Sequence, residues 1–417
     1  MRDVYVIGVG MTRFGKYADR SVRGLAAEAI RSALLDAGID WRRIEAVAFA
    51  NSNWGFFSGQ HSIKGQVILR DLGMTAIPVV NVENACAGGS TAFHLAWLNV
   101  ASGLHDCCMA LGAEKIFHED KAKMFESFWG GMDVENRRAH LEMMLGFAAG
   151  IDLEVPGQGD AAGAGRSRSP FMDLYSAVCR WHMAEYGTTA RQLALIAEKN
   201  HYHGSLNPLA QYQHRVSVEE VLAARSVSWP LTLPMCAPVG DGGAAAILCS
   251  KAVLKKLNVP GAAVRVLASV LASGSDRAGD EDRKDIGVRL SGQAYERAGL
   301  GPEDIDLAEV HDASAFGELH QTEALGFCKF GEGGALAESG TTRLGGRLPV
   351  NPSGGLESRG HPIGASGLGQ IHELVVQLRH GAGARQVEKC RIALAENGGG
   401  NLGFEEAAMG ITILERF

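Results

Sequence analysis

The sequence predicts an α/β protein whose two halves repeat one order of elements, and three observations carry this prediction. Short apolar runs alternate with helix-like stretches from the N-terminus to about residue 111, and the alternation returns after residue 263. Each half also contains a glycine-rich turn that carries a reactive side chain and opens a helix. Alternation of this kind is typical of β-α-β units with right-handed crossovers. We therefore expect a largely parallel sheet.

The N-terminal part is expected to enter the fold at once. Apolar runs predict four strands, at Val4–Val9, Ile44–Ala50, Pro78–Val82 and Cys107–Leu111. Ser21 is expected to cap a helix that runs through Leu35, and Ser90–Ser102 is expected to form a buried helix. Because Met1–Gly8 already has the pattern of a strand, we expect no signal peptide.

The alternation stops between about Glu114 and Ser228. This stretch is rich in methionine, aromatic, histidine and charged residues, and we interpret it as an insertion that covers one face of the site. Helices are expected around Met172–Tyr186 and Ala190–His201, and Gly157–Ser169 is expected to be irregular. The expected domains are residues 1–262, which include the insertion at about 114–228, and residues 263–417.

The C-terminal part repeats the alternation. Pro234–Ser250 returns to the core, with Asp241–Leu248 as a turn into a strand. Further strands are expected at Ala263–Ala272, Ile305–Val310, Arg391–Ala395 and Met409–Leu414. Helices are expected at Arg283–Ala298 and Ala315–Leu325, and from the His361 turn through Leu378. A duplicated fold would bring the two glycine-rich turns together.

Composition excludes several classes of protein. The chain has 417 residues, of which 46% are hydrophobic and 21% charged, as in ordinary globular proteins. A net charge of −7 gives no electrostatic reason to bind nucleic acid or an anionic membrane. No apolar run approaches the roughly 18–20 residues that span a bilayer. The eight cysteines form no Cys-x-x-Cys pair, so we expect no metal site. Because they are scattered along a large chain, we expect the protein in a reducing cytoplasm.

Two motifs carry the expected chemistry. Cys86 lies in Asn84-Ala85-Cys86-Ala87-Gly88-Gly89-Ser90, and His361 lies in Gly360-His361-Pro362-Ile363-Gly364-Ala365-Ser366-Gly367. Alone, Cys86 would pass for a small buried hydrophobe, and a lone histidine before proline is often structural. A cysteine at a helix start, however, is expected to have a lowered thiol pKa and a backbone N–H that can hold an oxyanion. Together the motifs predict acyl transfer through a cysteine thioester.

Two further segments lie where ligands bind in open parallel sheets, at the ends of strands. His311 and Asp312 end one predicted strand, and His311 is a second candidate donor to an oxyanion, although an exposed loop histidine and a capping aspartate would leave the same pattern. Glu396 follows the last interior strand and would serve as a general base if burial raised its pKa; more often such a glutamate is paired or solvated. The groups expected to bind an oxyanion or thioester are Asn397, Gly398, Gly399 and Ser366.

These segments together resemble the thiolase superfamily, and Asp241-Gly242-Gly243-Ala244 and Gly112-Ala113-Glu114-Lys115 resemble further landmarks of it. The similarity covers nearly the whole chain, and His311-Asp312 resembles the sterol-carrier-protein branch. The resemblance implies a duplicated five-layered αβαβα fold, a homodimer core and a CoA-thioester substrate. It implies that Cys86 carries the acyl group, that His361 activates it, and that Gly398 and the Cys86 N–H form a second oxyanion hole. It implies no permanently bound cofactor, with coenzyme A as co-substrate.

One departure concerns the second cysteine, which ordinary thiolases use as acid/base at the substrate α-carbon. The corresponding positions here hold Glu396 and Ala313, and alanine cannot move a proton. Glu396, His311 or a substrate carboxylate is the expected substitute. The departure resembles specialised degradative relatives that work with a small OB-fold/zinc-ribbon subunit, such as the thiolase for benzoylsuccinyl-CoA in toluene breakdown. Aromatic residues in Asn51–Phe57 and Phe125–Trp129 would line an aromatic pocket or simply pack in the core.

The leading hypothesis is therefore a degradative thiolase that cleaves a β-ketoacyl-CoA with CoA through a Cys86 acyl-enzyme. A retro-aldolase acting on a β-hydroxyacyl-CoA with an OB-fold/zinc-ribbon partner is the first alternative, because the second cysteine is absent. A condensing enzyme with an acyl-carrier or malonyl donor is another. A non-catalytic acyl-CoA-binding subunit is the alternative from a different class.

Overall fold

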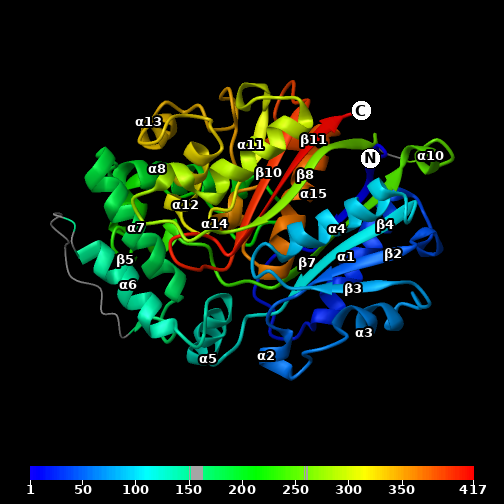
Figure 1. The fold of residues 1–417 in the computed structure, drawn as a ribbon, viewed down its shortest axis with the longest axis horizontal. Coiled ribbons are helices and arrows are strands. Elements are labelled where there is room, and N and C mark those ends of the chain that lie inside the picture. The colour runs from blue at the N-terminus through cyan, green and yellow to red at the C-terminus, as the bar shows by residue number, and fades with distance from the viewer. Residues whose placement is uncertain (150, 152–162, 258, 260–261) are drawn as a thin grey trace.

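The computed structural model describes residues 1–149, 151, 163–257, 259 and 262–417, and a nine-stranded sheet runs through its centre (Figure 1). The strand order is β3-β2-β4-β7-β1-β8-β11-β10-β9. The strands span Val4–Met11 (β1), Ala46–Ala50 (β2), Val79–Val82 (β3), Cys107–Glu114 (β4), Gly242–Ser250 (β7), Val264–Ser273 (β8), Leu307–Glu309 (β9), Ile392–Gly399 (β10) and Ala408–Arg416 (β11). A separate hairpin pairs Ser226–Ser228 (β5) with Leu231–Thr232 (β6).

The sheet consists of two halves with matching topology. Strands β2, β4, β7 and β1 lie side by side in one half, and β9, β10, β11 and β8 repeat this order and these relative directions in the other. In the position of β3, Val350 forms a parallel bridge to Ala308 of β9. The halves join where β1 meets β8, at Tyr5↔Arg265 and Val6↔Val264. The duplication predicted from the sequence is therefore present.

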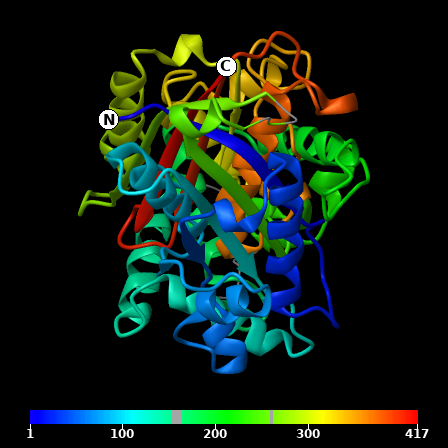
Figure 2. The same cartoon turned by 90° about the vertical axis from the view of Figure 1, so that its right-hand side faces the viewer.

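Helices form the remaining layers. Helices α4 (Gly88–Ser102) and α15 (Ser366–Leu378) lie in the middle, since each contacts strands of both halves and the other helix. Helix α1 (Val22–Ala37) covers the outer face of β1 and β7, as Figure 2 shows, and α11 (Ile286–Ala298) covers β8 and β11. The chain thus has the five-layered αβαβα architecture that the resemblance implies. Both α4 and α15 begin next to the turns that carry the reactive residues.

The prediction of a largely parallel sheet is wrong. Among the described strands, only β2–β3, β2–β4 and β9–β10 pair in parallel, and β7 and β11 run antiparallel to both of their neighbours. The connection between β10 and β11 shows the reason in one case. It contains only residues 400–407 and no helix, whereas a parallel return needs a crossover of a dozen or more residues.

The segment between β4 and β7 is mainly helical. It contains α5 (Lys121–Glu126), α6 (Arg137–Ala149), α7 (Pro170–Tyr186), α8 (Ala190–Ser205) and α9 (Val218–Ala223). The predicted helices at 172–186 and 190–201 correspond to α7 and α8, and α8 begins with a Thr189–Gln192 capping box. Of the stretch predicted to be irregular, residues 157–162 lie outside the described residues, and 163–169 form a turn with an isolated bridge.

Short helices that sequence patterns did not indicate complete the fold: α2 (Trp54–Ser58), α3 (Lys64–Asp71), α10 (Lys251–Leu254), α13 (Gly333–Glu338) and α14 (Gly355–Arg359). The predicted helix at 315–325 corresponds to α12 (Ala315–Ala324). Ser21 caps α1 as expected, because its side chain accepts a hydrogen bond from the Gly24 N–H. Across the described residues, no helix has the length and apolar character needed to cross a bilayer.

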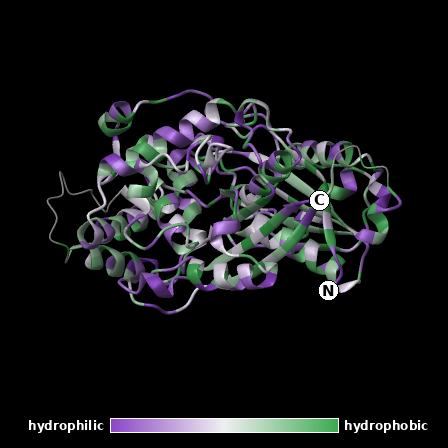
Figure 3. Cartoon of the chain, turned by 90° about the horizontal axis from the view of Figure 1, so that it is seen from above, coloured by the Kyte–Doolittle hydropathy of each residue, from purple (hydrophilic) through white to green (hydrophobic). Residues whose placement is uncertain are grey.

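The hydrophobic core follows the layers. One cluster of buried side chains lies between the two halves around α4 and α15, a second lies under α1, and a third lies under α11. Figure 3 shows the apolar residues concentrated along the central strands. Both faces of the sheet are thus buried in each half, which leaves the ends of strands and the turns beyond them as the places for a ligand.

Candidate active site

The Cys86 turn is held in a tight conformation. Ala85, directly before the cysteine, has a left-handed backbone (φ 46°) although it is not glycine. The Ala85 N–H donates to Glu83 Oε1 (2.7 Å), and the side chain of Asn84 donates to Thr91 Oγ1 (3.0 Å) on α4. Such a conformation persists only when its surroundings enforce it. These bonds therefore fix the thiol at the start of α4.

Buried charged residues hold the helix that leads into the His361 turn. Helix α14 leads into it, and Asp312 Oδ1 caps that helix by accepting the Leu356 N–H (2.7 Å). Arg359, at the end of α14, is buried and pairs with Glu309 (2.8 Å) on β9. Gly360 then has φ 105°, a conformation that favours glycine, and His361 forms a parallel bridge with Val239. Asp312 is thus a capping residue for the helix that presents His361.

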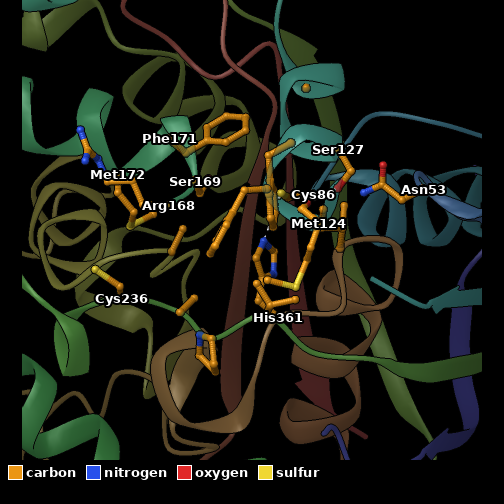
Figure 4. A pocket seen from close by; sticks show the side chains of 18 of the residues that line it. Asn53, Cys86, Met124, Ser127, Arg168, Ser169, Phe171, Met172, Cys236 and His361 are labelled. Atoms are coloured by element: carbon orange, nitrogen blue, oxygen red, sulfur yellow. Dashed lines mark hydrogen bonds between the residues drawn. The ribbon is translucent and has the colours of Figure 1, made fainter. Parts of the chain in front are cut away.

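The two predicted reactive side chains meet. His361 Nε2 lies 3.1 Å from Cys86 Sγ, and Figure 4 shows the two facing one another. On the other side of the ring, Ser366 Oγ lies 2.7 Å from Nδ1 and 2.9 Å from the Pro362 carbonyl. A carbonyl only accepts, so the hydroxyl proton goes to Pro362 and the oxygen accepts from Nδ1–H. In a neutral ring this leaves the Nε2 lone pair directed at the thiol.

Both groups are uncharged at rest. Burial raises the pKa of the Cys86 thiol to about 12, although the Gly400 backbone N–H hydrogen-bonds the sulfur and opposes the shift. Burial, His311 and Arg359 hold the pKa of His361 well below its ordinary value. The expectation that a helix start lowers the pKa of this thiol is wrong, because desolvation of the sulfur outweighs the neighbouring N–H groups. The pair is thus a neutral thiol next to a base that can accept its proton.

His311 lies against the same pair. Its ring centre is 5.2 Å from that of His361, in an edge-to-face arrangement. The Asn397 amide donates to His311 Nδ1 (3.1 Å), and Ser90 Oγ donates to the same amide (2.7 Å), so the proton of neutral His311 is on Nε2. Burial, followed by the charge of Arg359, lowers the pKa of His311 to about 3. His311 is therefore a neutral N–H donor at the cavity wall.

One ligand atom each of Cys86, His311 and His361 lies within 4.8 Å of the others. This spacing would also suit a soft metal ion, which nitrogen and sulfur ligands bind. A metal held there would occupy the sulfur that acyl transfer needs. Acyl transfer and metal binding are thus mutually exclusive uses of these three side chains.

The remaining predicted residues occupy different places. Glu396 does not line the cavity but lies behind His311, and its Oε2 accepts a hydrogen bond from the His311 backbone N–H (2.8 Å). Burial raises the pKa of Glu396 well above its ordinary value. Ser366 is on the side of His361 that faces away from Cys86. Gly399 lines the cavity, whereas Asn397 and Gly398 lie behind it, with Asn397 acting through His311. The glycine that donates to the sulfur is Gly400.

A large cavity opens in front of the thiol. Its volume is about 1080 Å³, and Cys86, His311 and His361 form part of its wall. Figure 4 shows Met124 beside Cys86 and His361, and Phe171 across the space. Among the aromatic residues predicted either to line a pocket or to pack in the core, those that line the cavity are Phe56, Phe125, Phe128 and Trp129. Phe57 instead packs in a small cluster and stacks on His118.

The two further landmark motifs hold the site together. Glu114 accepts hydrogen bonds from Asn51, Ser52 and Asn53 and from the Gly364 N–H (3.1 Å) in the His361 turn. Asp241 accepts from Ile116 (2.7 Å) and pairs with Lys115 (2.9 Å). These acids are therefore positioning residues.

Tyr175 and Glu406 are among the cavity-lining groups that sequence reasoning missed. Tyr175 is one of several aromatic residues in α7, and Glu406 stands in a short loop after the glycine run. Neither belongs to a motif, and only the tertiary fold brings them to the thiol.

Comparison with known proteins agrees with this geometry. A model of the thiolase N-terminal domain matches residues 4–148, and a thiolase C-terminal domain-like model matches residues 280–414. The chain is 40% identical over 408 residues to an acetyl-CoA acetyltransferase of Methanothermobacter thermautotrophicus (97% of this chain, 98% of that protein). It is 38% identical over 423 residues to sterol carrier protein 2 of Bos taurus (97% and 73%).

A third relative is the benzoylsuccinyl-CoA thiolase subunit BbsB of Thauera aromatica, at 35% identity over 407 residues (96% of this chain, 95% of that protein). Among solved structures, the Ltp2-ChsH2(DUF35) aldolase superposes with a TM-score of 0.77 at 24% identity (99% of this chain, 98% of that chain) and shows the same fold. The chain therefore belongs to the thiolase family and is an acyltransferase of the thiolase type.

Proposed function

We propose that the chain is a degradative thiolase that cleaves a β-ketoacyl-CoA with coenzyme A through an acyl-enzyme on Cys86. The observation that carries this proposal is the 3.1 Å contact between Cys86 Sγ and the unprotonated Nε2 of His361. A nucleophile paired with a base, which is oriented in turn by a third group, is the arrangement that covalent catalysis requires. Ser366 is the orienting group here.

The geometry supports a sequence of steps. His361 takes the thiol proton as the sulfur attacks the β-carbonyl carbon, and this transfer is needed because the thiol is neutral at rest. Cleavage of the bond between the α- and β-carbons leaves the acyl group on Cys86 and the other product as an enolate. His311 Nε2–H and the newly protonated His361 are donors for the enolate oxygen. Coenzyme A then takes the acyl group from the sulfur.

The cavity supports a bulky acyl group, and we propose an aromatic one. Phe125, Phe128 and Trp129 present apolar surface in a cavity of about 1080 Å³, far larger than an acetyl group requires. One relative named above is a subunit of a thiolase for benzoylsuccinyl-CoA, an aromatic thioester. Coenzyme A is proposed as co-substrate, with no resident cofactor.

We propose a homodimer core, to which a small second subunit binds. Two comparisons support a partner: BbsB is named as a subunit, and the Ltp2-ChsH2(DUF35) aldolase is named as a pair. A cytoplasmic location is proposed as well, since all eight cysteines are free thiols.

A retro-aldolase remains the second candidate function. The observation in its favour is Ala313, which lines the cavity at a position where the related branch has a thiol. A retro-aldolase would cleave a β-hydroxyacyl-CoA without an acyl-enzyme, and free CoA would be unnecessary.

Intact-mass spectrometry separates these functions. After incubation with benzoyl-CoA or acetyl-CoA, the wild-type chain should gain the mass of one acyl group, and Cys86→Ala should gain none. Cleavage of β-ketoacyl-CoA substrates should require free CoA and should be lost in Cys86→Ala. Cleavage independent of both CoA and Cys86 would establish the aldolase, and an unmodified wild-type chain without turnover would indicate a binding subunit.

A further inference from the structure

Cleavage of a carbon–carbon bond in the proposed reaction requires a second acid/base. The electron pair of the broken bond remains on the α-carbon, and this carbon must receive a proton before the product leaves. His361 is committed to Cys86, and Ala313 has no proton to give. Among the described residues, the carboxylates that line the cavity are Glu83, Glu126 and Glu406.

Two of these carboxylates are poor candidates. Glu83 is exposed, and its Oε1 already accepts from Ser52 Oγ (2.6 Å) and from the Ala85 N–H (2.7 Å). Glu126 is exposed on the cavity rim. Glu406 differs, because it is partly buried and lines the cavity wall.

The loop between β10 and β11 (Figure 1) brings Glu406 to the end of the strand that faces the thiol. Its side chain packs over Gly398, where an added Cβ would lie 2.8 Å from Glu406 Cγ. Two residues further on, Gly400 donates its N–H to Cys86 Sγ. The phenol of Tyr175 interacts electrostatically with both Glu406 and Cys86, so these groups share one side of the cavity. The absent side chain at Gly398 makes the room that Glu406 uses.

A second, smaller cavity of about 60 Å³ lies beyond Glu406, which lines both. This space exceeds what a water molecule needs. Gln321 Nε2 donates to Glu406 Oε1 (3.4 Å), while its own Oε1 is buried without a partner. His320 lines the same small cavity, with Nε2 3.6 Å from Asp285 Oδ2. The titratable pair of His320 and Asp285 thus lines the small cavity next to Glu406.

The groups around Glu406 shift its pKa in opposite directions. Burial, followed by the neighbouring charge of Asp285, raises its pKa, and His320 and Arg277 oppose the rise, so that the pKa of Glu406 is about 7. Glu396 on β10 faces it as a further buried carboxyl. A group with such a pKa exists in both forms near neutral pH, which favours transfer of a proton in either direction.

We propose that Glu406 is the acid/base at the substrate α-carbon and exchanges its proton with the small cavity that contains His320. The proposal rests on the proposed thiolase function. During cleavage the Cα–Cβ bond breaks, its electron pair passes into the enolate, and the Glu406 carboxylic acid gives its proton to Cα. The carboxylate then takes the thiol proton of CoA as the CoA sulfur attacks the Cys86 thioester. Cys86 leaves as a thiolate and recovers its proton from His361.

Exchange of α-protons tests this role. With acetyl-CoA or succinyl-CoA in D₂O, the wild-type enzyme should place deuterium on the α-carbon, as mass spectrometry measures. Glu406→Gln should lose at least about 100-fold of this exchange rate, the usual contribution of a general acid/base, while Cys86 still becomes acylated. Glu406→Asp should retain a measurable fraction. The control is Glu338→Gln, an exposed carboxyl that does not line the cavity, and this variant should exchange at the wild-type rate.

Each other outcome overturns a different statement. Wild-type exchange in a folded Glu406→Gln, or no exchange by a wild-type enzyme that is acylated on Cys86, would exclude Glu406 as the acid/base. Loss of acylation together with exchange would make Glu406 a positioning residue. A wild-type chain that is never acylated would instead refute the proposed function.

His320 supplies a second readout. Removing its charge in His320→Gln should raise the pKa of Glu406, so the midpoint of the pH dependence of exchange should move to higher pH. An unchanged midpoint in a folded variant would exclude His320 from the proton route.

Discussion

At the scale of single residues, the site depends on a thiol and an imidazole that are both neutral. A thiolate–imidazolium pair would be reactive at rest, but here burial disfavours the charged form of each partner. Ser366 contributes because its hydroxyl oxygen accepts a hydrogen bond from Nδ1–H of His361, which leaves Nε2 free to act as a base. The reactivity that we propose for Cys86 therefore belongs to the complex with substrate and not to the free enzyme.

Alkylation of the free enzyme tests this protonation state. The pKa of Cys86 is raised, so the thiolate fraction is small at neutral pH and grows only as pH rises toward about 12. The rate of Cys86 modification by iodoacetamide, measured by mass spectrometry, should increase steadily from pH 6 to pH 9. A plateau that begins below pH 7 would show an ion pair and contradict this expectation.

Ser366→Ala tests the orientation of His361. The variant removes the acceptor of Nδ1–H, and a hydrogen bond of this kind contributes about 0.5–1.5 kcal/mol. We expect kcat to fall by roughly tenfold, with KM nearly unchanged, because Ser366 does not line the cavity. Steady-state kinetics of the wild type, of Ser366→Ala and of Ser366→Thr, which keeps a hydroxyl, measure the effect. A large change in KM alone would contradict the assignment.

At the scale of elements, the two reactive turns are held by backbone-to-backbone contact. An added Cβ at Gly399 on β10 would lie 2.2 Å from the Ala87 N, and one at Gly112 on β4 would lie 2.1 Å from the Gly364 carbonyl oxygen. Strands from both halves therefore press directly on the turns of Cys86 and His361. Glycine is needed at these positions for space.

Gly399→Ala should consequently displace the Cys86 turn. We expect most activity to be lost, together with acylation of Cys86, because the new methyl group meets backbone that cannot move aside. Gly146→Ala in α6 is the matched control, since its Cβ would meet open space. That change should leave turnover intact and stabilise the protein by about 0.5–1 kcal/mol. Full activity in Gly399→Ala would refute the close contact.

Glu114→Gln tests the link between the loop at 51–53 and the His361 turn. The amide keeps one acceptor oxygen but turns an N–H₂ group toward backbone donors, which leaves buried donors unsatisfied. We expect a loss of about 1–3 kcal/mol in the free energy of unfolding, measured by urea denaturation. The exposed carboxyl change Glu338→Gln should have no measurable effect on the same quantity. Equal stability of the two variants would contradict the positioning role.

At the scale of the whole molecule, the sheet has two edges of different character. Strand β9 is buried, and Val350 pairs with it, whereas β3 is partly exposed, with Val80 49% accessible. An exposed edge strand with an apolar residue is a template for pairing with another strand. The proposed homodimer is therefore expected to form at β3.

Val80→Lys should weaken that dimer. A charged side chain on an edge strand opposes edge-to-edge pairing, and Val80 makes little contribution to the core because of its exposure. Light scattering after size-exclusion chromatography should show the wild type as a dimer and the variant shifted toward monomer at the same concentration. A variant that remains fully dimeric would exclude this edge as the interface.

Some features were predictable because they depend on local sequence. The Ser21 cap, the strand before Cys86 and the helices after both glycine-rich turns follow from residue type and spacing alone. Strand direction did not follow, since β7 and β11 look like any apolar strand and their antiparallel pairing depends on how the chain returns. Glu396 and Glu406 lie only ten residues apart, and nothing in the sequence indicates which of them lines the cavity.

By itself the sequence determined the duplicated α/β architecture and singled out Cys86 and His361, because glycine-rich turns and apolar periodicity are visible within a few residues. Only the tertiary structure decided the protonation of those residues and which of the two glutamates, Glu396 or Glu406, lines the cavity. A pKa depends on burial and on charges contributed by distant segments, as Arg359 and His320 show here. Those neighbours meet only after the chain has folded.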